Sequence, residues 1–192
     1  LVDDSGNFYF LEVNTRLQVE HPITEMTTGL DLVEWQLRVA SGESLPLRQE
    51  EITRSGHAIE VRICAENPAN QFLPEVGPLH RFAYPTELEG IRIDTGVVEG
   101  DEISIYYDSM IAKLIAYGDD RAQAQQKLIA ALAQTAVIGV KTNIDFLAKV
   151  AREPDFSLGK VDTHFIAQHS ASLLSAPEKA PPTIATSNSG II

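Results

Sequence analysis

Apolar and polar residues alternate most regularly near the start of the chain. From Leu11 to Val19 an apolar side chain recurs at every second position, and Thr15 is the only exception. A period of two is typical of a strand with one face in a core. The opposite face would carry large polar side chains, namely Glu12, Asn14, Arg16, Gln18 and Glu20. This segment therefore predicts a strand whose polar face either binds a ligand or is simply solvated, as in many antiparallel sheets.

Turn and helix signals lie on both sides of this strand. Ser5-Gly-Asn7 predicts a tight turn, so residues 1–3 and 8–13 should pair as antiparallel neighbours. Because a chain seldom opens inside a hairpin, we expect the sequence to be a fragment of a longer protein. After Pro22, Thr24 is expected to cap a short helical turn. A helix is predicted over 31–42, with Asp31-x-x-Glu34 as a capping box and Gly42 at its end. Its spacing predicts a buried stripe of Leu30, Val33, Leu37 and Ala40.

A linker at 44–54 separates this region from a second pattern of strands and helices. His57–Cys64 predicts a strand with Ile59, Val61 and Ile63 on one face and Glu60, Arg62 and Cys64 on the other. More strands are predicted at 79–84, 91–94, 103–106, 110–117 and 136–140, and helices at 121–135, 143–151 and 163–169. Residues 143 and 120 are the expected helix caps. Beyond Ser170 the chain is rich in Ser, Ala, Pro and Thr without periodicity, which predicts a flexible tail.

Composition narrows the choice of partners. The formal net charge of −12 argues against nucleic acid and anionic membranes, because no basic field would attract them. The single cysteine, Cys64, excludes an internal disulfide framework and is expected to be inert in a reducing compartment. An acidic chain that handles anionic substrates must use local arginines, so Arg16 and Arg62 are the candidate anion ligands.

The polar face of the first strand suggests a specific chemistry. Glu12 and Asn14 offer oxygen ligands to a hard cation such as Mg²⁺. Arg16 presents a planar fork for a small anion such as bicarbonate, carboxylate or phosphate. Glu20, beyond the arginine, can act as a base toward whatever the arginine holds.

These residues carry a family resemblance. The run Glu12-Val-Asn-Thr-Arg-Leu-Gln-Val-Glu-His-Pro-Ile-Thr-Glu25 resembles the signature of the ATP-grasp biotin carboxylases. The similarity continues through Gly56-His-Ala-Ile-Glu-Val-Arg-Ile-Cys-Ala-Glu66, Phe72-Leu-Pro74, Tyr107-Asp-Ser-Met-Ile-Ala-Lys-Leu114 and Gly139-Val-Lys-Thr-Asn143. It covers about residues 1–170, and it is most like the alpha type of 3-methylcrotonyl-, propionyl- and acetyl-CoA carboxylases.

The resemblance implies an α+β fold in separate parts. Residues 1–45 would be the C-terminal end of an ATP-grasp antiparallel sheet. Residues 54–170 would be the biotin carboxylase C-terminal domain, a mixed sheet with flanking helices. Residues 171–192 would be a flexible tail or linker.

The resemblance also implies a role for each site residue. Glu12 and Asn14 would bind Mg²⁺ (or Mn²⁺) at the ATP phosphates. Arg16 would grip bicarbonate with Gln18 and the backbone of Val19, and Glu20 would take its proton, so that carboxyphosphate forms. Arg62 would hold the ureido oxygen of biotin and stabilise its enolate. Asp108 would aim an active-site arginine from behind, and His21 would position Glu20 through the backbone. Lys113 and Lys141 lie in family motifs with either a structural or a functional role.

The sequence lacks a glycine-rich phosphate loop, nucleotide-binding lysines and a Met-Lys-Met biotin-attachment motif. We therefore expect these residues to be inactive by themselves. The expected partners are a biotin carboxyl carrier domain, a carboxyltransferase subunit and a second copy bound through the C-terminal domain, with Arg92 a candidate contact. The expected location is the bacterial cytoplasm. The alternatives are another ATP-grasp ligase, such as carbamoyl-phosphate synthetase, and a non-catalytic dimerisation module.

Overall fold

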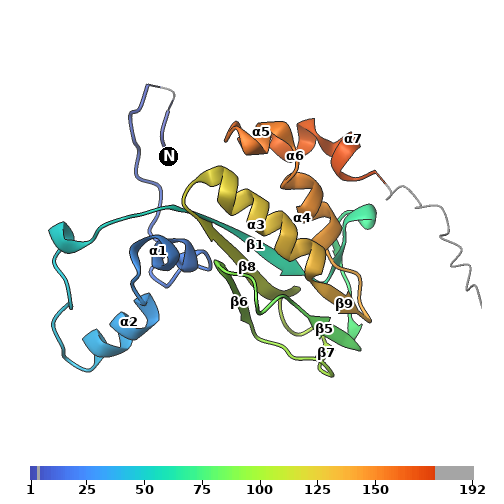
Figure 1. Ribbon diagram of the computed structural model, residues 1–192, viewed down its shortest axis with the longest axis horizontal. Helices are drawn as coiled ribbons and strands as arrows, with labels where there is room; N and C mark the ends of the chain where they lie inside the picture. The colour runs from blue at the N-terminus through green and yellow to red at the C-terminus, as the bar shows by residue number, and fades with distance from the viewer. Residues whose placement is uncertain (4, 176–192) are drawn as a thin grey trace, which may run out of the picture.

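A three-stranded antiparallel sheet forms the centre of the protein. The computed structural model describes residues 1–3 and 5–175. Strands β1 (His57–Cys64), β8 (Met110–Gly118) and β6 (Ile91–Thr95) hydrogen-bond in the order β1-β8-β6 (Figure 1). The α+β class is confirmed. The expected mixed sheet is wrong for the described residues, because all of their strand pairs are antiparallel.

One face of this sheet is apolar and lies under two helices, α3 (Arg121–Gln134) and α4 (Ile144–Val150) (Figure 1). The predicted start of α3 is confirmed, since the Asp120 carboxylate accepts a hydrogen bond of 2.8 Å from the Gln123 amide. The largest fully buried side chains between the sheet and these helices are Ile63, Leu114, Leu128 and Leu132. Burial of this apolar area is the main favourable term in the folding of the domain.

The opposite face of the sheet is polar. Arg62 pairs with Lys113 across β1 and β8, and Lys113 pairs with Asp94 across β8 and β6. Cross-strand partners point to the same side of a sheet, so these three charges form a row. Helix α1 (His21–Thr28) packs on this face, beside β1 and β8 (Figure 1).

Short strands and helices surround the central sheet. The paired strands are β2 (Glu66–Asn67) with β3 (Leu73–Pro74), β4 (Gly77–Pro78) with β7 (Glu102–Ile103), and β5 (Arg81–Ala83) with β9 (Ala136–Ile138). Short helices α5 (Pro154–Ser157), α6 (Phe165–Gln168) and α7 (Ser170–Leu173) follow α4. The strands predicted at 79–84, 103–106 and 136–140 are thus shorter than expected.

The predicted tail begins too early. Residues 170–173 form helix α7, and the Leu173 side chain is only 2% exposed. Residues 176–192, where the rest of the predicted tail lies, are outside the described residues. None of the helices within 1–3 and 5–175 has the length and apolarity needed to cross a membrane.

The strand predicted over Leu11–Val19 does not form. Residues 10–15 have no regular secondary structure, and the side chains of Phe8, Phe10 and Leu11 are exposed. The expected turn does bring Val2 and Phe8 together as an isolated antiparallel bridge. A strand needs backbone partners on a neighbouring strand, and the described residues supply none beyond this bridge. The alternation of apolar and polar residues therefore indicates a sequence that can form a strand, but no strand forms there in this structure.

Helices α1 and α2 (Leu32–Ala40) correct further details of the prediction. Thr24 lies inside α1, which begins after Glu20 and has a proline in its first turn. The Asp31 carboxylate caps α2 as predicted, through a 2.8 Å hydrogen bond from the Glu34 amide. The expected buried stripe is wrong, because α2 has no buried residue and stands apart from the sheet (Figure 1).

Candidate active site

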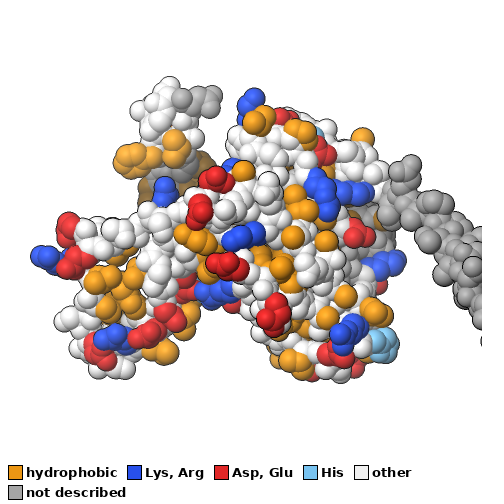
Figure 2. Space-filling model, in the orientation of Figure 1, with side chains coloured by type: hydrophobic (Ala, Val, Ile, Leu, Met, Phe, Trp, Pro, Cys, Tyr) orange, Lys and Arg blue, Asp and Glu red, His pale blue; other side chains and the backbone are white. Residues whose placement is uncertain are grey.

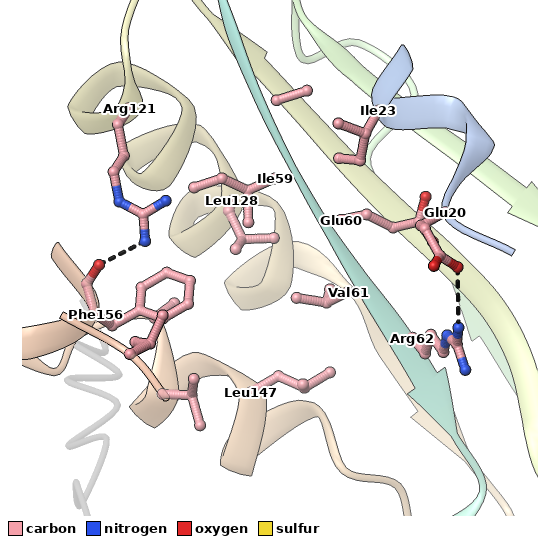
Figure 3. Close-up of a pocket in the computed structure, with 14 residues that line it drawn as sticks. Glu20, Ile23, Ile59, Glu60, Val61, Arg62, Arg121, Leu128, Leu147 and Phe156 are labelled. Carbon is pink, nitrogen blue, oxygen red and sulfur yellow. Dashed lines mark hydrogen bonds and ion pairs between the residues drawn. The ribbon is translucent and has the colours of Figure 1, made fainter. Parts of the chain in front are cut away.

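An ion pair joins two segments that lie 42 residues apart in the sequence. The Arg62 guanidinium on β1 lies 3.3 Å, Nη2 to Oε2, from the Glu20 carboxylate, which precedes α1 (Figure 3). Both side chains are more than half exposed, 54% for Arg62 and 58% for Glu20. An exposed pair of this kind contributes at most about 1 kcal/mol to stability. Both groups can therefore exchange this contact for a bound ligand at low cost.

The turn that carries Glu20 is fixed to the polar face of the sheet. The Lys113 ammonium donates a 2.9 Å hydrogen bond to the Val19 carbonyl, and its side chain is only 12% exposed. The His21 Nδ1 lies 2.7 Å from the Gln18 carbonyl, which ties the ring to the same turn. The action of His21 on Glu20 through the backbone stays a prediction, whereas Lys113 has a structural contact on a point that the sequence left open.

A network of charges lies behind this turn. The Glu25 carboxylate is 6% exposed, and it accepts 2.6 Å and 2.7 Å hydrogen bonds from Arg92 Nη1 and from the Leu32 amide. Arg92 also donates two hydrogen bonds to Asp94, at 2.7 Å and 2.9 Å, and Lys113 lies 3.3 Å from Asp94. Arg92, the candidate contact for a second copy, is thus already paired with Glu25 and Asp94 within the single chain.

The network shifts the pKa values of Arg92 and Asp94. The hydrogen bonds that Arg92 donates to Asp94 and Glu25 raise its pKa, against the effect of burial. Burial of Asp94 would raise its pKa, but the hydrogen bonds and charges of Arg92 and Lys113 outweigh it and lower the pKa. Both shifts favour the charged forms, so Arg92 and Asp94 remain ionised at neutral pH.

Glu60 lies on the same strand face as Arg62 and has a different environment. Burial raises the pKa of Glu60, although the charges of Lys113 and Arg62 oppose that shift. Its Oε2 atom is buried and has no hydrogen-bond partner among the residues that the structure describes. The charged form of Glu60 is therefore less stable than that of an exposed glutamate.

A groove of about 520 Å³ follows the free edge of β1. Glu20, Glu60 and Arg62 line one side, and Leu128, Leu147 and Phe156 line the other (Figure 3). The groove thus offers charged groups beside an apolar wall, which is the usual character of a ligand site.

The predicted metal and anion ligands lie outside this groove. Glu12, Asn14 and Arg16 are exposed on the irregular segment, and Arg16 Nη1 donates to the Leu17 carbonyl at 3.1 Å. The described part of the chain has no group of three acidic, histidine or cysteine side chains placed to hold a metal ion. Glu12 and Asn14 still suit Mg²⁺, because this ion takes few protein oxygens and completes its shell with phosphate and water.

Of the two remaining predicted residues, Asp108 has different surroundings from those expected and Cys64 does not. The Asp108 carboxylate accepts a 2.8 Å hydrogen bond from the Met110 amide and forms no ion pair with an arginine among the described residues. Asp108 thus stabilises the turn before β8. Burial raises the pKa of the Cys64 thiol to about 11, which agrees with the expectation that it is inert.

Comparison with known protein families divides the chain in two. Residues 60–168 match the biotin carboxylase C-terminal domain, and residues 1–48 match the ATP binding domain of the carbamoyl-phosphate synthase L chain.

Individual proteins of known sequence and structure give the same result. Mouse mitochondrial methylcrotonoyl-CoA carboxylase subunit alpha is 53% identical over 174 residues, which are 91% of this chain and 24% of that protein. The biotin carboxylase of Halalkalibacterium halodurans is 52% identical over 169 residues, or 88% of this chain and 37% of that protein. The solved biotin carboxylase domain dimer of Hydrogenobacter thermophilus 2-oxoglutarate carboxylase, in complex with MgADP, ADP and bicarbonate, is 42% identical. Its TM-score is 0.87, over 92% of this chain and 39% of that one.

These relatives add two facts. The chain spans about a quarter of the length of methylcrotonoyl-CoA carboxylase subunit alpha. The expected bacterial cytoplasmic location is wrong, because the related subunits of mouse, rat and Arabidopsis thaliana are mitochondrial.

Proposed function

The chain belongs to the biotin carboxylase family, and on this basis we propose that it forms part of an enzyme that carboxylates biotin with bicarbonate and ATP. The observation that carries the proposal is the contact between Glu20 and Arg62, which both line the groove. A carboxylate that can accept a proton and a cation that can hold an oxyanion are the two groups that this reaction needs side by side.

Bicarbonate binding and activation would fall to the segment before α1. Arg16 would grip bicarbonate, assisted by Gln18 and the backbone of Val19. Glu20 would accept its proton, which frees an oxygen to attack the γ-phosphate. The turn from Gln18 to His21 is held by Lys113 and by the His21 ring, so Glu20 needs little rearrangement to reach its substrate.

Glu12 and Asn14 would hold Mg²⁺ or Mn²⁺, which neutralises charge on the ATP phosphates when bound. Their exposure leaves both side chains free to bind an ion. A related biotin carboxylase domain dimer binds MgADP and bicarbonate, which supports this assignment.

Arg62 would act on biotin after bicarbonate is activated. Its guanidinium would hold the ureido oxygen of biotin and stabilise the negative charge that develops there. It sits near the end of β1, a strand of the sheet at the centre of the domain, and this strand carries the guanidinium.

In the longer enzyme, residues 1–45 would complete the ATP-grasp domain and residues 54–170 would form the C-terminal domain. The two family matches, at 1–48 and 60–168, support these boundaries. Relatives are components of multidomain or multisubunit carboxylases, and a biotin carboxylase domain dimer is known. The partners would be a biotin carboxyl carrier domain and a carboxyltransferase subunit. The 192 residues alone should not cleave ATP, since they contain no phosphate loop.

Two substitutions in the full-length enzyme separate the roles of Glu20 and Arg62. Glu20→Gln keeps the shape of the side chain but removes the proton acceptor, so bicarbonate-dependent ATP cleavage and biotin carboxylation should both fall by about 10²–10⁴-fold. Arg62→Ala should lower biotin carboxylation by about 10²–10³-fold, which is the usual cost of losing one charge-stabilising donor, and should lower ATP cleavage much less.

Both rates are measured on the same preparations, with bicarbonate-dependent phosphate release for ATP cleavage. Exposed Arg48, on the linker, provides a control in Arg48→Ala. An equal loss of both rates in Arg62→Ala would mean that Arg62 serves bicarbonate activation, and its assignment to biotin would be rejected.

A further inference from the structure

The Asn143 side chain binds the backbone of β1 at Arg62 and Cys64. Its Nδ2 donates a 3.0 Å hydrogen bond to the Arg62 carbonyl, and its Oδ1 accepts a 2.9 Å hydrogen bond from the Cys64 amide. The backbone N–H of Asn143 also donates a hydrogen bond to the Cys64 carbonyl, at 3.2 Å. One residue, 79 positions away from Cys64, thus satisfies three backbone groups of this strand.

These groups lie on the free edge of the sheet. β1 is the outer strand in the order β1-β8-β6, so it has a partner on one side only. The Ala65 amide donates to the Ser109 carbonyl, toward β8. Backbone groups of successive residues in a strand point to opposite sides, so those of Cys64 point to the free edge. Asn143 therefore replaces a partner strand at the end of β1.

The strand needs such a partner at this point, because its pairing is irregular there. Ile63 pairs with Ala112 but Cys64 pairs with Met110, so β8 contains one extra residue, Ile111. A bulge bends and twists the strand and loosens the ladder locally. Without support on its free edge, the end of β1 that carries Arg62 would be held less firmly.

The Asn143 side chain does not cap the helix that follows it. It precedes α4, where an asparagine normally caps the helix with its side chain, yet no such hydrogen bond is present. The side chain is 7% exposed and turns to β1 instead. An amide is the group that fits, because the Arg62 carbonyl needs a donor and the Cys64 amide needs an acceptor.

We propose that Asn143 is a positioning residue for Arg62, which it holds in place through the backbone of β1 at the bulge. The inference rests on the proposed function, in which the Arg62 guanidinium acts on biotin. A small displacement of a group that must meet developing charge lowers the rate far more than it lowers stability.

The first test compares two rates in the full-length enzyme. Asn143→Ala should lower biotin carboxylation by about 10-fold or more and leave bicarbonate-dependent ATP cleavage within about threefold. Gln125→Ala is the matched control, because Gln125 is also a buried amide, 8% exposed, which bonds Ala151 and Ser157 and forms no hydrogen bond with β1 among the described residues. Gln125→Ala should leave the ratio of the two rates unchanged. An unchanged ratio in Asn143→Ala, or an equal change in Gln125→Ala, would overturn the proposal.

A double-mutant cycle keeps this inference separate from the role given to Arg62. If Asn143 acts through Arg62, Asn143→Ala should have little further effect on carboxylation in an Arg62→Ala background. Losses that multiply would refute the positioning role, whatever Arg62 does. If Arg62→Ala lowers both rates equally, the proposed function of Arg62 fails while the cycle still measures the coupling.

Asn143→Asp and hydrogen exchange cover the case in which the alanine variant does not fold. A carboxylate can still accept from the Cys64 amide but cannot donate to the Arg62 carbonyl. Exchange at Cys64 should stay slow in Asn143→Asp and rise about 10-fold or more in Asn143→Ala, with Ile59 and Val61 unchanged in both. Carboxylation should nevertheless fall in Asn143→Asp. Normal carboxylation in that variant would show that the bond to Arg62 does not matter.

Discussion

Glu60 illustrates how the polar face of the sheet balances burial against charge. Lys113 and Arg62 lie close enough to stabilise its carboxylate, but burial outweighs them and raises the pKa above the ordinary 4.5. One of its oxygens is buried without a partner in the part of the chain that the structure describes. A buried carboxylate with an open acceptor costs stability when charged and less when protonated.

The sign of the resulting pH dependence follows from proton binding. A pKa raised in the folded state means that the folded protein binds the proton more tightly than the unfolded chain does. The stabilising effect of this proton is present below 4.5 and is lost as the pH rises through the folded pKa of Glu60. Glu60→Gln removes the charge and keeps the shape. Its Tm should therefore exceed that of the unmodified protein at about pH 7, and the difference should shrink toward about pH 4.

Thermal unfolding monitored by circular dichroism between these two pH values tests this expectation. A lower Tm for Glu60→Gln at neutral pH would show that the attraction of Lys113 and Arg62 for the carboxylate exceeds the cost of its burial.

The individual site residues were foreseen to different degrees. The motifs singled out Glu20 and Arg62, and the structure brings these two together. They also included Lys113, whose bond to Val19 depends on the placement of α1 over β8 and leaves no local signal. Asn143 was predicted to cap a helix, which is the common role of asparagine before one. Only the approach of α4 to the free edge of β1 gives Asn143 a different role, and periodicity carries no information on that approach.

Elements with a long regular pattern were predicted well. β1, β8 and α3 begin and end within about two residues of the expected positions, because each buries one face over several turns or pleats. The two-residue strands and the segment Leu11–Val19 were not predicted correctly, since their state depends on whether a neighbouring strand is present. Helix α2 formed as predicted, but its apolar stripe has no surface to pack on among the described residues.

Helices α3 and α2 should accordingly respond differently to the same substitution. The Leu128 side chain on α3 is fully buried, whereas Leu37 on α2 is 66% exposed. Leu128→Ala should lower the free energy of unfolding by about 2–5 kcal/mol through lost burial and the cavity left behind. Leu37→Ala should change it by no more than about 0.5 kcal/mol.

Urea denaturation of the 192-residue chain gives both values. A cost above about 1 kcal/mol for Leu37→Ala would mean that the apolar face of α2 packs on another surface in solution, as the sequence pattern predicted.

Several polar contacts join the N-terminal segment to the domain. Lys113 holds the turn before α1, Arg92 holds Glu25 within α1, and the Ser55 amide donates to the Thr27 carbonyl at 2.9 Å. Hydrophobic side chains remain at the surface around α2. They lie beside the hollow between the N-terminal segment and the domain (Figure 2). The proposed function requires Glu20, on the segment, to face Arg62, on the domain. The polar contacts therefore help to hold the two halves of the site together.

Arg92 and Arg38 make it possible to compare a buried contact of this kind with an exposed one. Arg92→Ala leaves the Glu25 carboxylate, which is 6% exposed, without its cation, and breaking such a pair costs about 3–5 kcal/mol. Arg38 on α2 pairs with Glu34 and Glu43 at the surface, so Arg38→Ala should cost about 0.2–1 kcal/mol. Urea denaturation measures both costs, and hydrogen exchange in α1 should accelerate in Arg92→Ala alone. Equal costs for the two variants would mean that α1 is held by its apolar contacts, and the Glu20–Arg62 pair would then not depend on the charge network behind it.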